Sequence, residues 1–357
     1  MVTLCPSFEE NTSPLHRRLL RTVFLLALCL VAATQVRAVT AELADNRKIW
    51  DAGAHNAFTD LVRWHDRWWC TFRESEGHVG GDGGIRVIVS ADGVKWESAA
   101  LLTEKDVDLR DPKLTVTPEG RLMLNCGGSI YLGTKQLKGR RSRVMFSSDG
   151  RTWTAPQKIL NEGDWLWRVT WHDGFAYGAA YRSGLGGSTA PGPEWTLSIY
   201  RSKDGLSWDL VKNMNVLGRP NETTLRFQPN GEMIALVRRE AEGFMGHIGY
   251  SKPPYTDWTW KESNHRFGGQ NAIQLPGGTW IVGTRDYTKL SAGVKNGAET
   301  MLAELGADGK LKPLLTFKSS GDTSYPGLVW HDGMLWVSYY SSHEGKTSIY
   351  LAKVKIK

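Results

Sequence analysis

Short apolar and aromatic runs recur along the chain, and each pair of runs is separated by a polar turn. Six such hairpins follow one another at intervals of about 47 to 57 residues, at 61–69, 114–124, 169–177, 224–234, 272–281 and 328–336. Trp-His-Asp occupies the turn of the first, third and sixth. Apolar arms around a polar turn predict β-hairpins, and their regular spacing predicts a repeat architecture.

A second pattern, Ser-x-Asp-Gly-x-x-Trp, interleaves with these hairpins. It occurs at Ser90–Trp96, Ser147–Trp153 and Ser202–Trp208, at intervals of about 55 residues. Asp-Gly favours a tight turn because glycine tolerates positive φ, and the Ser and Asp side chains can bind turn amides. Weaker copies follow, with only the two ends kept in 251–258 and only the turn kept in 307–309.

Each repeat therefore contains four short strands, and no helical periodicity extends beyond a turn or two. Six units of this kind predict an all-β fold, a six-bladed β-propeller of four-stranded antiparallel blades. We expect the last strand, Ser348–Val354, to close the ring against the segment near Lys48. No linker divides the repeats, so residues 39–357 are predicted to form one domain.

Residues 1–38 are predicted to be a cleaved signal peptide, because a basic stretch precedes an apolar run and a small-residue cleavage site. This predicts a secreted or periplasmic protein with no membrane attachment after cleavage. Cleavage lowers the net charge from +7 to about +5. The only dense basic cluster, Lys138–Arg143, is interpreted as a solvated loop, and no nucleic-acid partner is expected. Cys70 and Cys126 remain, as a disulfide or as two buried thiols, and the sequence leaves the oligomeric state open.

The sequence contains no local motif for a metal or a cofactor. Its nine histidines show no paired spacing, and no CxxC, GxSxG or P-loop is present. We therefore predict neither metal nor cofactor. Carboxylate, tyrosine and arginine chemistry remains, at the end of the propeller where the inner strands converge.

The Ser-x-Asp-Gly-x-x-Trp turns resemble the Asp-boxes of the sialidase (neuraminidase) superfamily, which has six blades, and the resemblance covers the chain after the signal peptide. Glu222 and Arg238 stand at the spacing of the sialidase Glu that activates the nucleophile and of one arginine of the substrate-binding triad. Arg285 resembles another triad arginine, and Tyr325 the nucleophile. Asp82, in a glycine-rich stretch, resembles the acid/base residue.

The resemblance implies retaining hydrolysis of a terminal, sialic-acid-like sugar in a glycan or glycoconjugate. A neutral Tyr, deprotonated by a Glu, avoids the repulsion that the substrate carboxylate would exert on a carboxylate nucleophile. Arginines bind that carboxylate, and an Asp protonates the leaving oxygen. The first triad arginine is missing from 55–61, and Arg73, Arg110 or Arg168 are candidates to replace it.

Two other functions stay open. Arg110-Asp111-Pro112 is similar to a motif of five-bladed β-fructosidases and related furanosidases, which would give Asp60, Asp111 and Glu222 the catalytic roles and Asp111 a place in the substrate site. A non-catalytic propeller that binds glycan or protein is the third possibility. Individual residues also have structural alternatives: Asp82 as a turn residue, Tyr325 as a packing residue, and Arg239 in place of Arg238 if the strand register is reversed.

Overall fold

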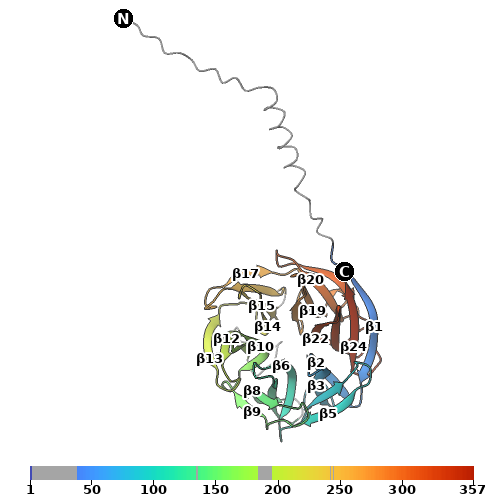
Figure 1. Ribbon diagram of the computed structural model, residues 1–357. Coiled ribbons are helices and arrows are strands. Elements are labelled where there is room, and N and C mark those ends of the chain that lie inside the picture. The colour runs from blue at the N-terminus through green and yellow to red at the C-terminus, as the bar shows by residue number, and fades with distance from the viewer. Residues whose placement is uncertain (2–37, 134–135, 184–194, 242, 244) are drawn as a thin grey trace. The chain divides into compact units, whose positions relative to one another are not determined.

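A computed structural model describes residues 1, 38–133, 136–183, 195–241, 243 and 245–357. Contacts divide the chain into two units, Met1–Ala38 and Val39–Lys357. The predicted signal peptide lies almost entirely outside the described residues. The second unit consists of six four-stranded antiparallel sheets arranged in a ring, as Figure 1 shows. The predicted six-bladed β-propeller is confirmed.

The strands of each blade follow one another from the axis outward. Blades 1 to 3 consist of β2 (His55–Trp64), β3 (Arg67–Ser75), β4 (Gly84–Ser90) and β5 (Glu97–Leu102); β6 (Asp108–Val116), β7 (Leu122–Leu132), β8 (Gln136–Ser147) and β9 (Gln157–Ile159); and β10 (Trp165–His172), β11 (Phe175–Arg182), β12 (Thr196–Ser202) and β13 (Asp209–Met214). Blades 4 and 5 consist of β14 (Pro220–Phe227), β15 (Met233–Arg239), β16 (His247–Ser251) and β17 (Thr259–Glu262); and β18 (Asn271–Gln274), β19 (Trp280–Asp286), β20 (Glu299–Leu305) and β21 (Leu311–Thr316).

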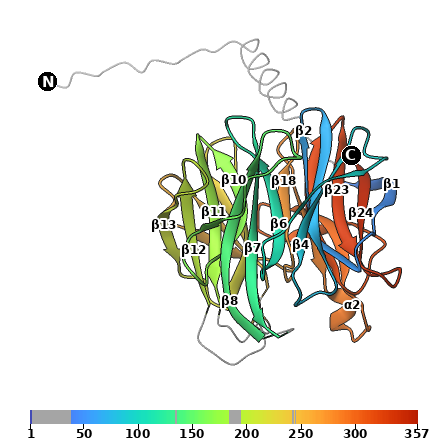
Figure 2. The same ribbon diagram turned by 90° about the horizontal axis from the view of Figure 1, so that it is seen from below.

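The sixth blade closes the ring with strands from both ends of the unit. It consists of β22 (Thr323–His331), β23 (Met334–Ser341), β24 (Ser348–Ile356) and β1 (Ala41–Trp50). Lys48 pairs with Tyr350, so the predicted closure is confirmed. The short helix α2 (Thr288–Ser291) follows β19 and lies on the face where the inner strands begin (Figure 2). Within the described residues, no helix has the length and apolar character needed to span a membrane.

The six predicted hairpins are the two innermost strands of the six blades. The Ser-x-Asp-Gly-x-x-Trp turns join the outer strands of blades 1 to 3, away from the axis. In each, the Ser hydroxyl accepts from the Gly amide and the Asp carboxylate accepts from the next two amides, as in Gly150 N–Ser147 Oγ (2.7 Å) and Arg151 N–Asp149 Oδ1 (2.8 Å). These turns therefore stabilise the scaffold.

Blades pack on one another through large aromatic side chains. Trp68 of blade 1 stacks on Trp336 of blade 6, with ring centroids 4.0 Å apart. Gly150 closes its turn with φ 73°, and a Cβ there would lie 2.1 Å from the ring of Trp69 in blade 1. The turn glycine is thus required twice, by its backbone conformation and by the neighbouring blade.

Cys70 and Cys126 are buried free thiols. The disulfide is thereby excluded and the alternative of two thiols is confirmed. Burial raises the pKa of both, that of Cys126 to about 12. The basic cluster Lys138–Arg143 was wrongly interpreted as a solvated loop. It belongs to strand β8, and Arg140 and Arg143 are buried.

Candidate active site

Five inner strands carry a β-bulge close to their first residues. The register of the inner hairpin shifts by one residue between Ala57 and Asp60, Arg110 and Lys113, Leu166 and Val169, Pro220 and Thr223, and Ser324 and Gly327. A bulge changes the direction of a side chain, which would otherwise lie on the face of the sheet. The residues inside the five bulges include Phe58, Asp111, Trp167, Glu222 and Tyr325.

Three of these bulge residues adopt left-handed backbone conformations. Phe58 has φ 67°, Asp111 has φ 52° and Tyr325 has φ 55°. Non-glycine residues avoid this region, and such strain gathers at functional sites. Asp111 and Tyr325 occupy the same bulge position in blades 2 and 6. The fold therefore presents these side chains from equivalent backbone positions.

Four of these side chains, Phe58, Asp111, Glu222 and Tyr325, line a cavity of about 260 Å³ at the face where the inner strands begin, which we call the axial pocket. Its polar lining includes Asp111, Glu222, Arg238 and Tyr325. Aromatic side chains of Phe58, Trp165, Tyr181 and Trp195 complete much of its wall. A small cavity of mixed aromatic and charged character that is open to solvent suits a single terminal sugar ring.

Tyr325 and Glu222 are in direct contact in this pocket. The buried Tyr325 hydroxyl donates a short hydrogen bond to Glu222 Oε1. Glu222 Oε2 accepts from the Gly269 amide at 2.8 Å. Burial and then the charge of Glu222 raise the pKa of Tyr325 well above its usual value. The resting phenol is thus protonated, with a carboxylate in place to receive its proton.

Arg238 binds the same oxygen of this carboxylate. Its Nη1 lies 2.8 Å from Glu222 Oε1, and its Nη2 lies 2.5 Å from Glu240 Oε1. Burial opposes the charge of Arg238, but the nearby Glu222, Tyr287 and Glu240 raise its pKa well above the usual value. Arg239 faces away and pairs with Glu262. The predicted strand register, with Arg238 inward, is the observed one.

Asp111 is another carboxylate that lines the pocket with Tyr325. It is buried, and burial raises its pKa, although Arg110 and Lys113 oppose the shift. Asp82, the expected acid/base residue, is exposed and is not among the described residues that line the axial pocket. The structure therefore brings Asp111 together with Glu222 and Tyr325, and leaves Asp82 outside.

The candidate arginines separate into different environments. Arg73 is fully buried and pairs with Asp108 Oδ1 at 2.6 Å, so it does not replace the missing triad arginine. Arg110 lines the pocket and donates to the His78 carbonyl (2.8 Å). Arg285 lies over the Tyr325 ring (5.7 Å), but its Nε and Nη2 donate to the Thr323 carbonyl.

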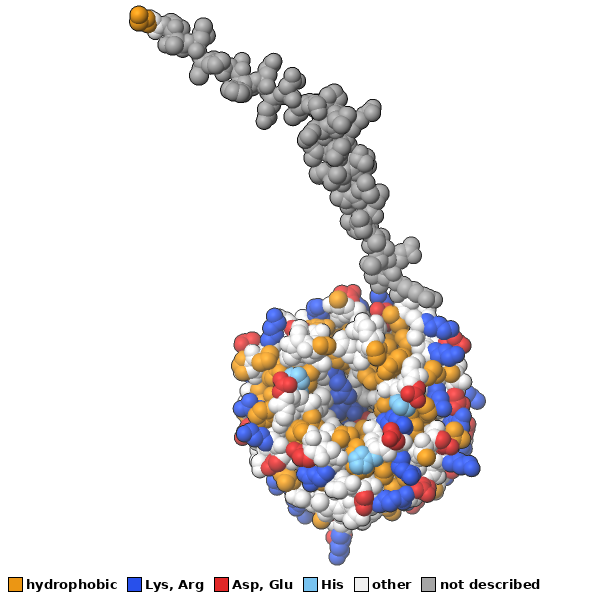
Figure 3. Space-filling view, viewed as in Figure 1, with side chains coloured by type: hydrophobic (Ala, Val, Ile, Leu, Met, Phe, Trp, Pro, Cys, Tyr) orange, Lys and Arg blue, Asp and Glu red, His pale blue; other side chains and the backbone are white. Residues whose placement is uncertain are grey.

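Arg168 belongs to a different cavity. It pairs with Asp60 Oδ2 at 2.7 Å, and both line a cavity of about 420 Å³ beyond the inner-strand bulges. Figure 3 shows the face opposite α2, where Lys and Arg side chains gather in a hollow at the centre of the ring. Since Asp60 lies in this second cavity, the carboxylates Asp60, Asp111 and Glu222 do not form one site. The five-bladed fructosidase architecture is wrong as well.

Sequence reasoning missed three charged residues at the axis. Arg140 lines the pocket, lies over the Trp165 ring at 6.0 Å, and donates to Ser183. Glu240 stands two residues after Arg238, and alternate residues of an extended chain share a side. This spacing is the signal in the sequence that could have identified Glu240. Lys113 is buried, 5.5 Å from the centre of the Tyr325 ring, and burial followed by Arg168 lowers its pKa to about 8.

Comparisons with known proteins identify the fold. No protein-family model and no curated protein matches the chain. It is similar to the structure of a protein of unknown function from Dyadobacter fermentans, with a TM-score of 0.76 and 17% identity over 89% of this chain and 100% of that one. It is also similar to Trypanosoma rangeli sialidase, with a TM-score of 0.65 and 10% identity over 88% of this chain and 59% of that one, less than two thirds of its length.

A third similar structure is that of an α-L-arabinofuranosidase from Fusarium graminearum in complex with an iminosugar inhibitor. Its TM-score is 0.64, with 15% identity over 88% of this chain and 98% of that one. Identities this low establish a shared propeller fold and leave function to the residues of the site.

Proposed function

We propose that this protein is a retaining glycoside hydrolase that removes a terminal sugar, with Tyr325 as nucleophile and Glu222 as its base. The observation that carries the proposal is the hydrogen bond from the buried Tyr325 hydroxyl to Glu222 inside the axial pocket. A buried phenol held on a carboxylate, with a guanidinium behind that carboxylate, is the arrangement that activates a tyrosine for attack.

The reaction uses two steps at the anomeric carbon. Tyr325 Oη attacks this carbon and passes its proton to Glu222, while the glycosidic bond breaks and the leaving oxygen takes a proton from a general acid. Water then attacks the glycosyl-tyrosine and gives its proton to that same acid/base residue. Tyr325 leaves and regains its proton from Glu222, so the anomeric configuration is retained.

We assign the acid/base role to Asp111 in place of Asp82. A general acid must carry its proton at the working pH, and burial raises the pKa of Asp111. Asp111 also lines the same cavity as Tyr325 and Glu222. In other glycosidases the general acid is likewise a carboxyl whose pKa its surroundings raise.

An anionic terminal sugar fits the charges of the pocket. Three arginines, Arg110, Arg140 and Arg238, line it. Arg238 is engaged by two carboxylates, whereas Arg140 Nη2 donates to the carbonyl and the hydroxyl of the uncharged Ser183. We therefore propose Arg140 as the main contact for a substrate carboxylate, in a sialic-acid-like sugar. The sialidase and arabinofuranosidase folds make a neutral arabinofuranoside the second candidate.

The proposed substrate is a glycan outside the cytoplasm. This part of the proposal rests on the signal peptide predicted for residues 1–38, and secretion of the full chain with cleavage near residue 38 would test it.

The deciding experiment is hydrolysis of aryl glycosides by the chain from residue 39. The panel contains an α-sialoside, an α-L-arabinofuranoside and a β-fructoside, with NMR of the first product anomer. Glu222→Gln is compared with Glu119→Gln, an exposed control. We expect one substrate to be cleaved with retention, and Glu222→Gln to lose at least about 100-fold in kcat. Inversion would overturn the tyrosine mechanism, and no cleavage of any glycoside would favour a non-catalytic binding propeller.

A further inference from the structure

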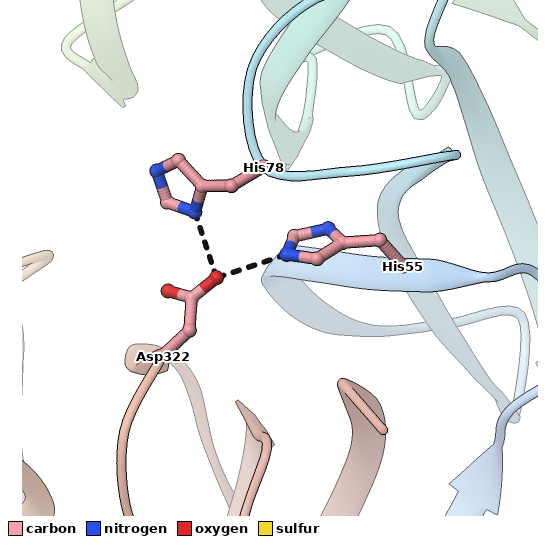
Figure 4. Close-up of side chains that lie close together, drawn as sticks. All are labelled: His55, His78 and Asp322. Carbon is pink, nitrogen blue, oxygen red and sulfur yellow. Dashed lines mark hydrogen bonds and ion pairs between the residues drawn. The ribbon is translucent and has the colours of Figure 1, made fainter. Parts of the chain in front are cut away.

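Three residues from distant parts of the chain meet beside the axial pocket, and we call them the His-Asp cluster: His55, His78 and Asp322. His55 begins β2, His78 lies in the connection between β3 and β4, and Asp322 directly precedes β22. Figure 4 shows both imidazoles directed at one carboxylate oxygen. His55 Nε2 lies 2.9 Å and His78 Nδ1 lies 2.7 Å from Asp322 Oδ2.

The three candidate ligand atoms lie close enough together to share one ion. They all lie within 4.8 Å of one another. Zn²⁺ bonds of about 2.0–2.2 Å to nitrogen and carboxylate oxygen need ligand atoms slightly more than 3 Å apart in a tetrahedral site. The present nitrogen–oxygen distances are a few tenths of an ångström shorter, so a small outward rotation of His78 and Asp322 makes room for the ion.

The carboxylate is oriented by a second contact. Tyr340 donates its hydroxyl hydrogen to Asp322 Oδ1 at 2.9 Å, which leaves Oδ2 directed at the histidines. Metal-binding carboxylates are commonly held in this way. The cluster is also open on one side, because the His78 side chain is 50% exposed and that of Asp322 is 25% exposed. An ion therefore has a route in and a free coordination position.

We propose that the His-Asp cluster is a Zn²⁺ site with three protein ligands and an open position toward solvent. Two imidazoles and one carboxylate match the ligands that catalytic zinc uses, whereas Ca²⁺ and Mg²⁺ prefer oxygen. Local spacing in the sequence predicted no metal, because the ligands stand at 55, 78 and 322 and only the closed ring brings them together.

A bound ion would connect blade 1 to blade 6 at the rim of the axial pocket. His78 itself lines the pocket, and Asp322 lies three residues before Tyr325. His55 Nδ1 is buried without a hydrogen-bond partner among the described residues. Binding through Nε2 would place the ring N–H at that position, so we expect micromolar affinity, weaker than in sites whose second nitrogen is paired.

The test is titration of Zn²⁺ into the untagged chain from residue 39 by calorimetry, with Ca²⁺ titrated in parallel. We expect one Zn²⁺ per chain, no Ca²⁺ binding at the same concentrations, and a melting temperature that rises by several degrees with zinc. His78→Ala removes one ligand and should weaken binding by about 100-fold or more. The matched control is His65→Ala, at an exposed hairpin turn on the opposite face.

Asp322→Asn is the second ligand variant, and circular dichroism establishes that each variant is folded. Co²⁺ added in place of Zn²⁺ should give the visible absorption of a low-symmetry site in the wild type and in His65→Ala. The same absorption should be absent in His78→Ala. Absence of saturable zinc binding would overturn the proposal. Binding that His78→Ala leaves unchanged would overturn it too and would place the ion elsewhere.

Discussion

Replacing Tyr325 by Phe separates the chemistry of its hydroxyl from the packing of its ring. The hydroxyl makes one buried hydrogen bond, to Glu222. After its removal Glu222 still binds Arg238 Nη1 at 2.8 Å and the Gly269 amide at 2.8 Å, so no carboxylate is left unpaired. Loss of one hydrogen bond to a charged group should cost about 1–3 kcal/mol of the free energy of unfolding.

The effect on the reaction should be far larger than the effect on stability. Without the nucleophile the two-step path is closed, and we expect kcat on the cleaved aryl glycoside to fall at least about 1,000-fold, or about 4 kcal/mol of transition-state stabilisation. Steady-state kinetics gives this loss. Thermal denaturation gives the stability change, at about 2–4 °C per kcal/mol for a domain of more than about 150 residues.

Tyr339→Phe is the matched control. Tyr339 is a buried tyrosine on β23 whose hydroxyl bonds to Asn46, outward from the axis. We expect a similar loss of stability and unchanged kinetics. The reasoning about Tyr325 is refuted if Tyr325→Phe keeps more than about a tenth of the wild-type kcat, since a tenfold effect of about 1.4 kcal/mol lies within the range of lost electrostatic contacts.

Three further outcomes follow from the geometry. Asp111→Asn should remove the alkaline limb of the pH–rate profile, because its pKa is raised by burial and activity is lost as pH rises through that value; a limb that persists would exclude Asp111 as the acid. Gly150→Ala should lower the free energy of unfolding, measured in urea, by about 2–5 kcal/mol. The control Gly120→Ala should lower it by about 1–2 kcal/mol, because φ there is 79° and nothing lies within 4 Å of the new Cβ. Equal losses would mean that the contact with the neighbouring tryptophan ring does not matter. Cys70 and Cys126 should not react with a thiol reagent in the native chain and should both react in guanidinium, because they are buried and their pKa values are raised; reaction in the native state would contradict their burial.

The propeller could be predicted from sequence because its determinants are local. A polar turn between apolar arms specifies a hairpin within about ten residues, and repetition at nearly constant spacing specifies the ring. Glu222, Arg238 and Tyr325 could be selected because the resemblance to sialidases assigns roles to residues at these places in the blades. They stand at fixed offsets from those hairpins, so the position of each along an inner strand follows from the turn.

The remaining site residues depend on contacts between distant segments. Asp82 lies in a glycine-rich stretch and Asp111 precedes a proline, and neither setting shows which carboxylate lies in the pocket. The course of the connection between β3 and β4, which carries Asp82, decides it. Arg140 lies in a run of positive charge that is typical of an exposed loop. Its burial results from the long hairpin of β7 and β8, which extends to the pocket wall.

The bulges are a further limit on prediction from sequence. One extra residue in a strand moves the next side chain to the other face, and no residue type in the sequence marks where the register shifts. The pre-proline positions Asp111 and Tyr325 are the nearest available indication, and Glu222 and Phe58 lack it.

The repeated bulge has a consequence for how such proteins diversify. It is a property of the backbone and occurs in five blades whatever side chain it carries, so a point mutation there exchanges the functional group offered at the axis while the hydrogen-bonded ladders on both sides persist. Substrate preference can therefore drift over evolutionary time without passing through unfolded intermediates. The same few axial positions can therefore carry different chemical groups on one scaffold.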